Sequence, residues 1–180
     1  MYSTIWHYYF TKIRVILLRK FNVTNVFQIP YLKSISINLE AHFKQNSNFE
    51  KKKILLLIEL ITGRKPKVLV VKSEDSITRN HYIVTFNKKD SLFFLYRFST
   101  IILPQIKFFR GFYLHKHVKD NYCLFSFKDP AVFYEITSKF ELFPNYESIK
   151  NFQLKLNFST TDKQKISYLL SLFKIPYIFI

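Results

Sequence analysis

The chain has 180 residues, 48% of them hydrophobic, and its 28 lysine and arginine residues against 12 acidic ones give a formal net charge of +16. This length predicts a single domain over 1–180, and so high a charge makes the folded chain repel itself unless an anionic partner neutralises it. A pI near 9.8 indicates that the most expected partner is nucleic acid and the next an anionic membrane surface. The lone cysteine, Cys123, excludes an intrachain disulfide and a cysteine-rich metal site, and it is typical of a reducing compartment.

The residue types that dominate the chain are those with AT-rich codons. Phe, Tyr, Ile, Asn and Lys are abundant, with 21 Phe and 12 Tyr. We interpret this bias as the mark of an organelle genome, and an AT-rich nuclear or bacterial genome is the alternative. Residues 1–20 lack the apolar core and the cleavage site of a signal peptide, so we expect no removed leader. No charge-free apolar window reaches 18 residues, so we expect no membrane span.

The first half of the chain alternates between helical and strand patterns. Ser47 and Glu50 have capping-box spacing before a helix, and Gly63 stands where a left-handed residue would end it. The expected elements are a helix over 1–20, a loop over 21–30, a strand over 32–39, a helix over 49–62, a strand over 67–71, a loop over 72–80 and a strand over 82–86. The apolar face of the first helix consists of Ile5, Tyr9, Ile13, Ile16 and Leu17.

The second half continues this alternation. Asp90 is expected to cap a helix that runs to Leu103 and is stopped by Pro104. Thr161 and Gln164, at capping-box spacing, predict a last helix that ends before Pro176. The remaining elements are an irregular segment over 104–121, a strand over 122–127 and a strand over 152–158, in which apolar and polar residues alternate.

Helices that alternate with half-polar strands predict an α+β fold. We expect a single, mostly antiparallel sheet with helices packed on one face and an open polar face on the other. The polar faces of the strands would present Ser34, Ser36, Asn38, Lys67, Thr85, Asn87, Gln153, Lys155 and Asn157. In a chain of charge +16 such a face suits RNA, and an ordinary solvated face is the alternative.

The residue clusters that catalysis needs are missing from the sequence. Glu74 and Asp75 are adjacent on a predicted loop, so they do not form the facing carboxylates that hold divalent ions. His115 and His117 are read as surface residues rather than metal ligands. Two glycines cannot build a phosphate-binding loop. We therefore expect no catalytic residues, no metal and no cofactor.

Nine segments, in order, resemble motifs of the bacterial-type large-subunit ribosomal protein family called L-five. The first three are "FNVTNVFQIP" at 21–30, "LKSISIN" at 32–38 and "LITGRKP" at 60–66. The others are "VTF" at 84–86, the segment 92–98, "LPQIKFFRG" at 103–111, "NY" at 121–122, "FYEI" at 133–136 and the tail 169–177. The resemblance covers nearly the whole chain, and the order of the segments makes it far more specific than any single motif.

The resemblance implies a structural role in the large ribosomal subunit. Members of the family bind 5S ribosomal RNA in the central protuberance, and the residues that approach this RNA correspond to Gln28, Asn38, Lys65 and Thr85. Arg64 stands where the family has glutamine, and it adds a cation at the turn after Gly63. The complete predicted RNA-binding set is Gln28, Lys33, Asn38, Arg64, Lys65, Lys67, Thr85 and Arg110.

Two segments depart from the family pattern. The family has a longer basic loop that touches transfer RNA, whereas the loop 72–80 is short and has Glu74 and Asp75 where cations are expected. The residues that resemble the family loop are Lys72, Ser73, Ser76 and Arg79. The glycine-rich loop that follows Gly111 in the family is replaced by 112–120, which has no glycine.

The resemblance also implies the partners and the location. The expected partners are 5S or large-subunit ribosomal RNA, neighbouring large-subunit proteins, a protein of the small-subunit head across an intersubunit bridge, and P-site transfer RNA. The expected location is the ribosome of the mitochondrial matrix, with the plastid as the second choice. Two other functions stay open at this point: a degenerate organellar intron-encoded nuclease or maturase, and an amphipathic membrane-associated subunit.

Overall fold

The computed structural model describes residues 7–43, 48–72, 78–106, 109, 111–113, 118–127, 132–138 and 149–178. The chain forms two compact units, each of which is described by itself. The terminal unit comprises 1–35, 86–124 and 156–180, and the central unit comprises 36–85 and 125–155. Long strands contribute residues to both units, since β1 spans Leu32–Phe43 and β7 spans Ile149–Phe158.

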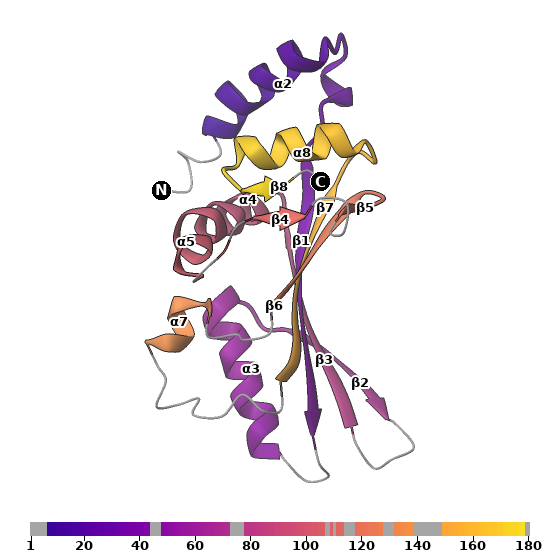
Figure 1. Ribbon diagram of the computed structural model, residues 1–180. Coiled ribbons are helices and arrows are strands. Elements are labelled where there is room, and N and C mark those ends of the chain that lie inside the picture. The colour runs from indigo at the N-terminus through magenta and orange to yellow at the C-terminus, as the bar shows by residue number, and fades with distance from the viewer. Residues whose placement is uncertain are drawn as a thin grey trace. The chain divides into compact units, whose positions relative to one another are not determined.

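The strands form a six-stranded sheet in the order β2-β3-β1-β7-β6-β5 (Figure 1). The remaining strands of this sheet are β2 at Lys67–Lys72, β3 at Thr78–Asn87, β5 at Val118–Lys119 and β6 at Tyr122–Phe127. The pairs β2–β3 and β5–β6 are antiparallel. Together with the helices this confirms the predicted α+β class. A separate two-stranded ladder, which the sequence did not predict, joins β4 at Phe112–Tyr113 in parallel to β8 at Tyr177–Ile178.

In the central unit, period-two alternation determines which face of each strand is buried. Ile37, Leu39 and Ala41 of β1 are fully buried, whereas the residues between them are only partly covered. The helix α3, Asn48–Thr62, buries residues at helical spacing, namely Ile54, Leu57, Ile58 and Ile61. Figure 1 shows α3 beside the strands of this unit. Phe133, just before α7 at Tyr134–Thr137, packs its ring 4.9 Å from that of Phe152 on β7.

In the terminal unit, three helical segments supply most of the buried surface. The first is a π-helical turn η1, Tyr9–Ile13, that continues into α2, Arg14–Phe21. The second runs through α4, Lys88–Arg97, the π-helical turn η3, Phe98–Ile102, and α5, Leu103–Gln105. The third is α8, Lys163–Leu172. The rings of Phe86 and Phe94 stack 5.0 Å apart, and those of Tyr9 and Phe173 lie 6.1 Å apart.

The structure corrects the predicted ends of two helices. Asn87, not Asp90, occupies the N-cap of α4, and Asp90 lies in the first turn instead. Pro104 does not stop the second helical segment, which reaches Gln105. The π turn η3 precedes the proline, and Leu103 donates its N–H to the Phe98 carbonyl five residues back. The proline therefore stands in the first turn of α5, where its missing N–H is not needed.

The last helix begins one residue later than its capping box predicts. Asp162 is its N-cap, and the Asp162 carboxylate accepts the Gln164 N–H at 3.0 Å. Thr161 lies before the cap. On the first helix, Tyr9, Ile13 and Leu17 are buried as predicted. Ile16 is 38% exposed, because the π turn shifts the position of the residues that follow it.

The strand predicted over 122–127 is confirmed as β6, whereas several other strands are longer than predicted. β1 extends to Phe43, β7 begins at Ile149, and β3 covers Thr78–Asn87 rather than 82–86. The pairing of β2 with β3 reaches Lys72 opposite Thr78, so residues 78–80 belong to a strand and not to the predicted loop 72–80. Of the segment 104–121, the structure describes α5, β4 and β5. None of the helices in the described part of the chain has the length and apolarity needed to cross a bilayer.

Candidate nucleic-acid interface

The turn after α3 is held in shape by a glycine and a threonine. Gly63 has φ +66°, and its N–H donates to the Glu59 carbonyl at 2.7 Å. The Thr62 hydroxyl donates to the Ile58 carbonyl at 2.7 Å and accepts the Arg64 N–H at 3.2 Å. The predicted left-handed end of this helix is therefore confirmed. The turn leaves both Arg64 and Lys65 exposed.

Arg64 and Thr85, which are 21 residues apart, meet on the partly exposed face of the central unit. The Arg64 guanidinium donates to the Thr85 carbonyl of β3 at 3.4 Å. The Thr85 hydroxyl lies 3.3 Å from the Ser36 hydroxyl of the neighbouring strand β1. Ile35 and Val84, next to these residues in the two strands, are buried. The predicted register is therefore confirmed, and we call Ser36, Asn38, Lys67 and Thr85 with Arg64 and Lys65 the polar face.

Two further predicted residues share this face. Lys67 is directly opposite Ile83 in the antiparallel pair, so it lies on the same side of the sheet as Thr85, two residues further along β3. Asn38 follows Ser36 by two residues on β1. The amide oxygen of Asn38 is buried and has no hydrogen-bond partner within the described part of the chain. An unpaired buried polar atom is unfavourable by about 1–3 kcal/mol.

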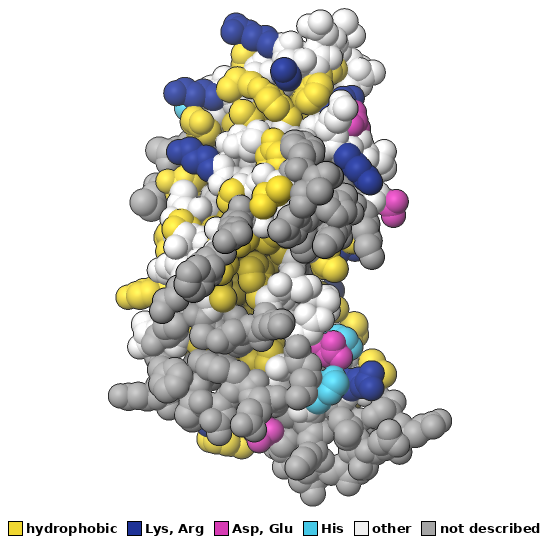
Figure 2. All heavy atoms as spheres, viewed as in Figure 1, with side chains coloured by type: hydrophobic (Ala, Val, Ile, Leu, Met, Phe, Trp, Pro, Cys, Tyr) yellow, Lys and Arg dark blue, Asp and Glu magenta, His cyan; other side chains and the backbone are white. Residues whose placement is uncertain are grey.

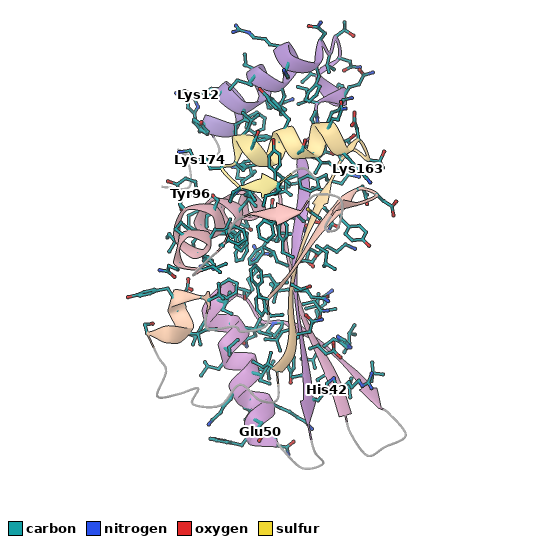
Figure 3. The ribbon with its side chains drawn as sticks, in the orientation of Figure 1. Lys12, His42, Glu50, Tyr96, Lys163 and Lys174 are labelled. Carbon is teal, nitrogen blue, oxygen red and sulfur yellow. The ribbon has the colours of Figure 1, made fainter. Side chains whose placement is uncertain are left out.

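The far end of this face carries charges of both signs. Glu40 and His42 of β1 form a 3.0 Å hydrogen bond. This bond, aided by the charges of His81 and Arg79 on β3, lowers the pKa of the Glu40 carboxyl. Figure 2 shows acidic, histidine and basic side chains gathered over the ends of these strands, and Figure 3 labels His42 there. The cationic end of the face is therefore the end at Arg64 and Lys67.

The other predicted site residues lie elsewhere. Gln28 is exposed in the terminal unit, on the 3-10 turn η2, Val26–Gln28. Lys33 is exposed but follows the alternation of Ile35 rather than that of Ser36, so the polar face does not include it. Lys72 ends β2. Arg79, exposed on β3 opposite Val71, lies at the mixed-charge far end of the same face and not beside Arg64. Arg110, Ser73 and Ser76 lie outside the described residues, as do His115 and His117.

The sequence predicted the open face that Ser36 and Thr85 share, but not the contacts that assemble it. Ser36 was expected on the open face, but its contact with Thr85 depends on strand pairing that no local motif encodes. The mixed-charge end was also missed, because Glu40 and His42 lie beyond the predicted end of β1. Cys123 is buried, and burial raises the pKa of its thiol to about 12, so it remains a neutral thiol. The described residues contain no cluster of His, Cys, Asp and Glu that could hold a metal ion.

The comparisons with known proteins agree on one family. The chain is 30% identical over 176 residues to the large ribosomal subunit protein uL5m of Reclinomonas americana, which covers 91% of this chain and 92% of that protein. It is 36% identical over 119 residues, 61% of this chain and 64% of the relative, to the protein uL5c of Cyanidium caldarium. It is 28% identical over 98% of its length to the uL5c of Gracilaria tenuistipitata var. liui, of which 99% is covered.

No protein-family model matches the chain. The match to the Reclinomonas protein nevertheless extends over nine tenths of both sequences. The chain therefore belongs to the uL5 family of large ribosomal subunit proteins, and it is a structural component of the ribosome rather than an enzyme.

Proposed function

We propose that this protein binds ribosomal RNA through the polar face, and that this RNA is the 5S RNA of the central protuberance. The observation that carries the proposal is the position of Arg64, whose guanidinium donates to the carbonyl of Thr85, the residue whose hydroxyl contacts that of Ser36. A cation fixed next to neutral hydrogen-bonding groups suits a phosphate with a neighbouring 2′-hydroxyl. The net charge of +16 supplies the long-range attraction.

The mechanism follows from the chemistry of these side chains. Arg64, Lys65 and Lys67 neutralise phosphates and release counterions, which sets the affinity and its dependence on salt. Hydroxyl and amide groups of Ser36, Asn38 and Thr85 then contact sugars and bases, and they position the RNA along the strands. The Asn38 side chain is partly exposed, so rotation of its amide can turn the unpaired oxygen, which is buried in the free protein, toward an RNA donor.

The location in the cell is part of the same proposal. We place the protein in the mitochondrial ribosome, supported by the match to a mitochondrial relative over 91% of the chain. Plastid relatives are also similar, so purified mitochondria and plastids should both be probed for the protein in their large subunits. Neighbouring large-subunit proteins, a small-subunit head protein and P-site transfer RNA complete the proposed partners, and the resemblance supports them.

The test is a salt titration of RNA binding with charge-neutralising variants. The double variant Arg64→Gln, Lys65→Gln should weaken binding of 5S RNA. The logarithm of its association constant should also fall less steeply with the logarithm of salt concentration, by about one to two units of slope. The matched control is Lys52→Gln, Lys53→Gln on α3, which removes the same charge from the same unit. Equal slopes for the two double variants would show that Arg64 and Lys65 contact no phosphate.

A further inference from the structure

The terminal unit contains a hollow of about 310 Å³ that the polar face does not include. Its walls come from three separate parts of the chain: the first helix, the segment 26–33 and the start of α4. This volume is at the lower end of the range for small-molecule sites and suits one planar group. We call it the aromatic hollow, because Phe10, Phe27 and Tyr31 line it together with the buried Tyr9.

The charged side chains that line the aromatic hollow are all positive. Arg14, Lys33 and Lys88 line it, and none of its lining residues is acidic. Burial raises the pKa of Tyr9 to about 12, so this phenol adds no negative charge. The Arg14 guanidinium lies 4.9 Å from the centre of the Phe10 ring, which orients a cation beside an aromatic surface. A ligand of the hollow therefore combines an anionic group with a flat, apolar one.

The aromatic rings are presented by fixed backbone. Phe27 is 92% exposed, and its N–H donates to the Asn25 side chain at 3.0 Å, which holds the turn η2. Tyr31 is tied to Ser159 twice: its N–H donates to the Ser159 hydroxyl at 2.9 Å, and its carbonyl accepts the Ser159 N–H at 3.0 Å. An almost fully exposed phenylalanine on a hydrogen-bonded turn is a ready stacking surface.

Lys88 is held at the hollow in an unusual backbone conformation. Its φ is +50°, and the Ser91 hydroxyl donates to its carbonyl at 2.6 Å. The left-handed backbone conformation is intrinsically unfavourable for lysine, and it persists where the surrounding structure imposes it. The strain places a cation at the start of α4, among the residues that line the hollow.

We propose that the aromatic hollow binds one unstacked nucleotide of ribosomal RNA. The base stacks on Phe27 and contacts Tyr31, while Arg14, Lys33 and Lys88 contact the adjoining phosphates. This inference rests on the proposed function, because it assumes that the protein binds RNA, and it adds a second contact point in the other unit. Unpaired bases that stack on aromatic side chains are the usual targets of sequence-tolerant RNA recognition.

The experiment uses two RNA hairpins of equal length, one fully paired and one with a single unpaired 2-aminopurine. The full-length protein should bind the bulged hairpin more tightly and quench its fluorescence. Phe27→Leu should reduce this preference about five-fold or more, because it removes the stacking ring and keeps an apolar side chain. Phe27→Trp should retain the preference. Lys88→Gln should lower the salt slope by about one unit on both hairpins.

The matched control is Phe49→Leu, because Phe49 is 71% exposed on α3 and has the Lys53 ammonium 4.6 Å from its ring centre. This variant should leave the preference unchanged. Equal losses from Phe27→Leu and Phe49→Leu, or no loss from Phe27→Leu, would overturn the inference while RNA binding itself stands. Failure of the unaltered protein to bind either hairpin or 5S RNA would instead overturn the proposed function, and this inference with it.

Discussion

At the scale of single residues, the two glycines of the chain are needed for different reasons. Gly111 has φ +124°, and a Cβ there would approach the Pro176 carbonyl oxygen to 3.3 Å, where β4 meets β8. Gly63 has φ +66°, and no neighbouring atom lies within 4 Å of the position that a Cβ would take, so only its backbone conformation favours glycine. Gly111 therefore allows two chain segments to approach, and Gly63 sets the direction of the turn that exposes Arg64 and Lys65.

Replacement of Gly63 should therefore destabilise the protein by a purely conformational effect. Gly63→Ala should lower the free energy of unfolding by about 1 kcal/mol, since a left-handed alanine is strained. Gly63→Asn should lose less, because asparagine tolerates this region. Urea unfolding of the two variants measures both values. Equal losses from alanine and asparagine would mean that this account of the turn is wrong.

Glu40, at the far end of the polar face, makes the stability of the fold depend on pH. The hydrogen bond with His42 lowers the pKa of the Glu40 carboxyl from its ordinary value of 4.5. Because the pKa is lower in the folded protein, the ionised carboxylate stabilises the fold above the unfolded pKa. This contribution is lost as the pH falls through the folded pKa. The pair is partly exposed, so the effect is small, at most about 1 kcal/mol.

The variant Glu40→Gln isolates this contribution. Its free energy of unfolding should lie below that of the unaltered protein at about pH 5.5, and the difference should shrink as the pH falls below 4.5, the ordinary pKa of the carboxyl. Glu59→Gln on α3 serves as the control for the removal of one carboxylate in the same unit. If the difference between Glu40→Gln and the unaltered protein stays constant over this range, the carboxylate does not interact with His42 in solution.

At the scale of elements, the sequence predicted the existence and type of most helices and strands but not all their ends. Apolar and polar residues alternate in β1 and β7, and apolar residues recur at helical spacing in α3. Both patterns are strong signals, because burial of one face makes them recur along the whole element. The predicted cap of α8 was wrong because two residues that can serve as an N-cap are neighbours there. Thr161 and Asp162 can both accept backbone N–H groups, and only the packing of α8 decides between them.

The choice of cap on α8 can be measured. Asp162→Ala should lower the free energy of unfolding by about 1 kcal/mol, because the Gln164 N–H loses its acceptor. Thr161→Ala should change it by less than half of that amount, since Thr161 lies outside the cap. Thermal or urea unfolding of both variants distinguishes them. A larger loss from Thr161→Ala would favour the capping box over the observed geometry.

At the scale of the whole molecule, the sequence indicated the class of partner but not the shape of the sites. The charge of +16 and the ordered motifs point to ribosomal RNA before any fold is known. The polar face required the pairing of β1 with β3, which brings Ser36 to Thr85 across 49 residues. The aromatic hollow combines Arg14, Phe27 and Lys88 from three segments, and no spacing rule connects them. Both sites are therefore products of tertiary structure.

The proposed function requires the polar face to contact ribosomal RNA in the assembled large subunit. The most direct measurement is ultraviolet cross-linking of intact large subunits, followed by mass spectrometry of peptides that carry RNA adducts. We expect adducts on the peptides that contain Arg64–Lys67 and Thr85. Adducts confined to the peptides of α3 or absent from the polar face, in subunits that contain the protein, would contradict it.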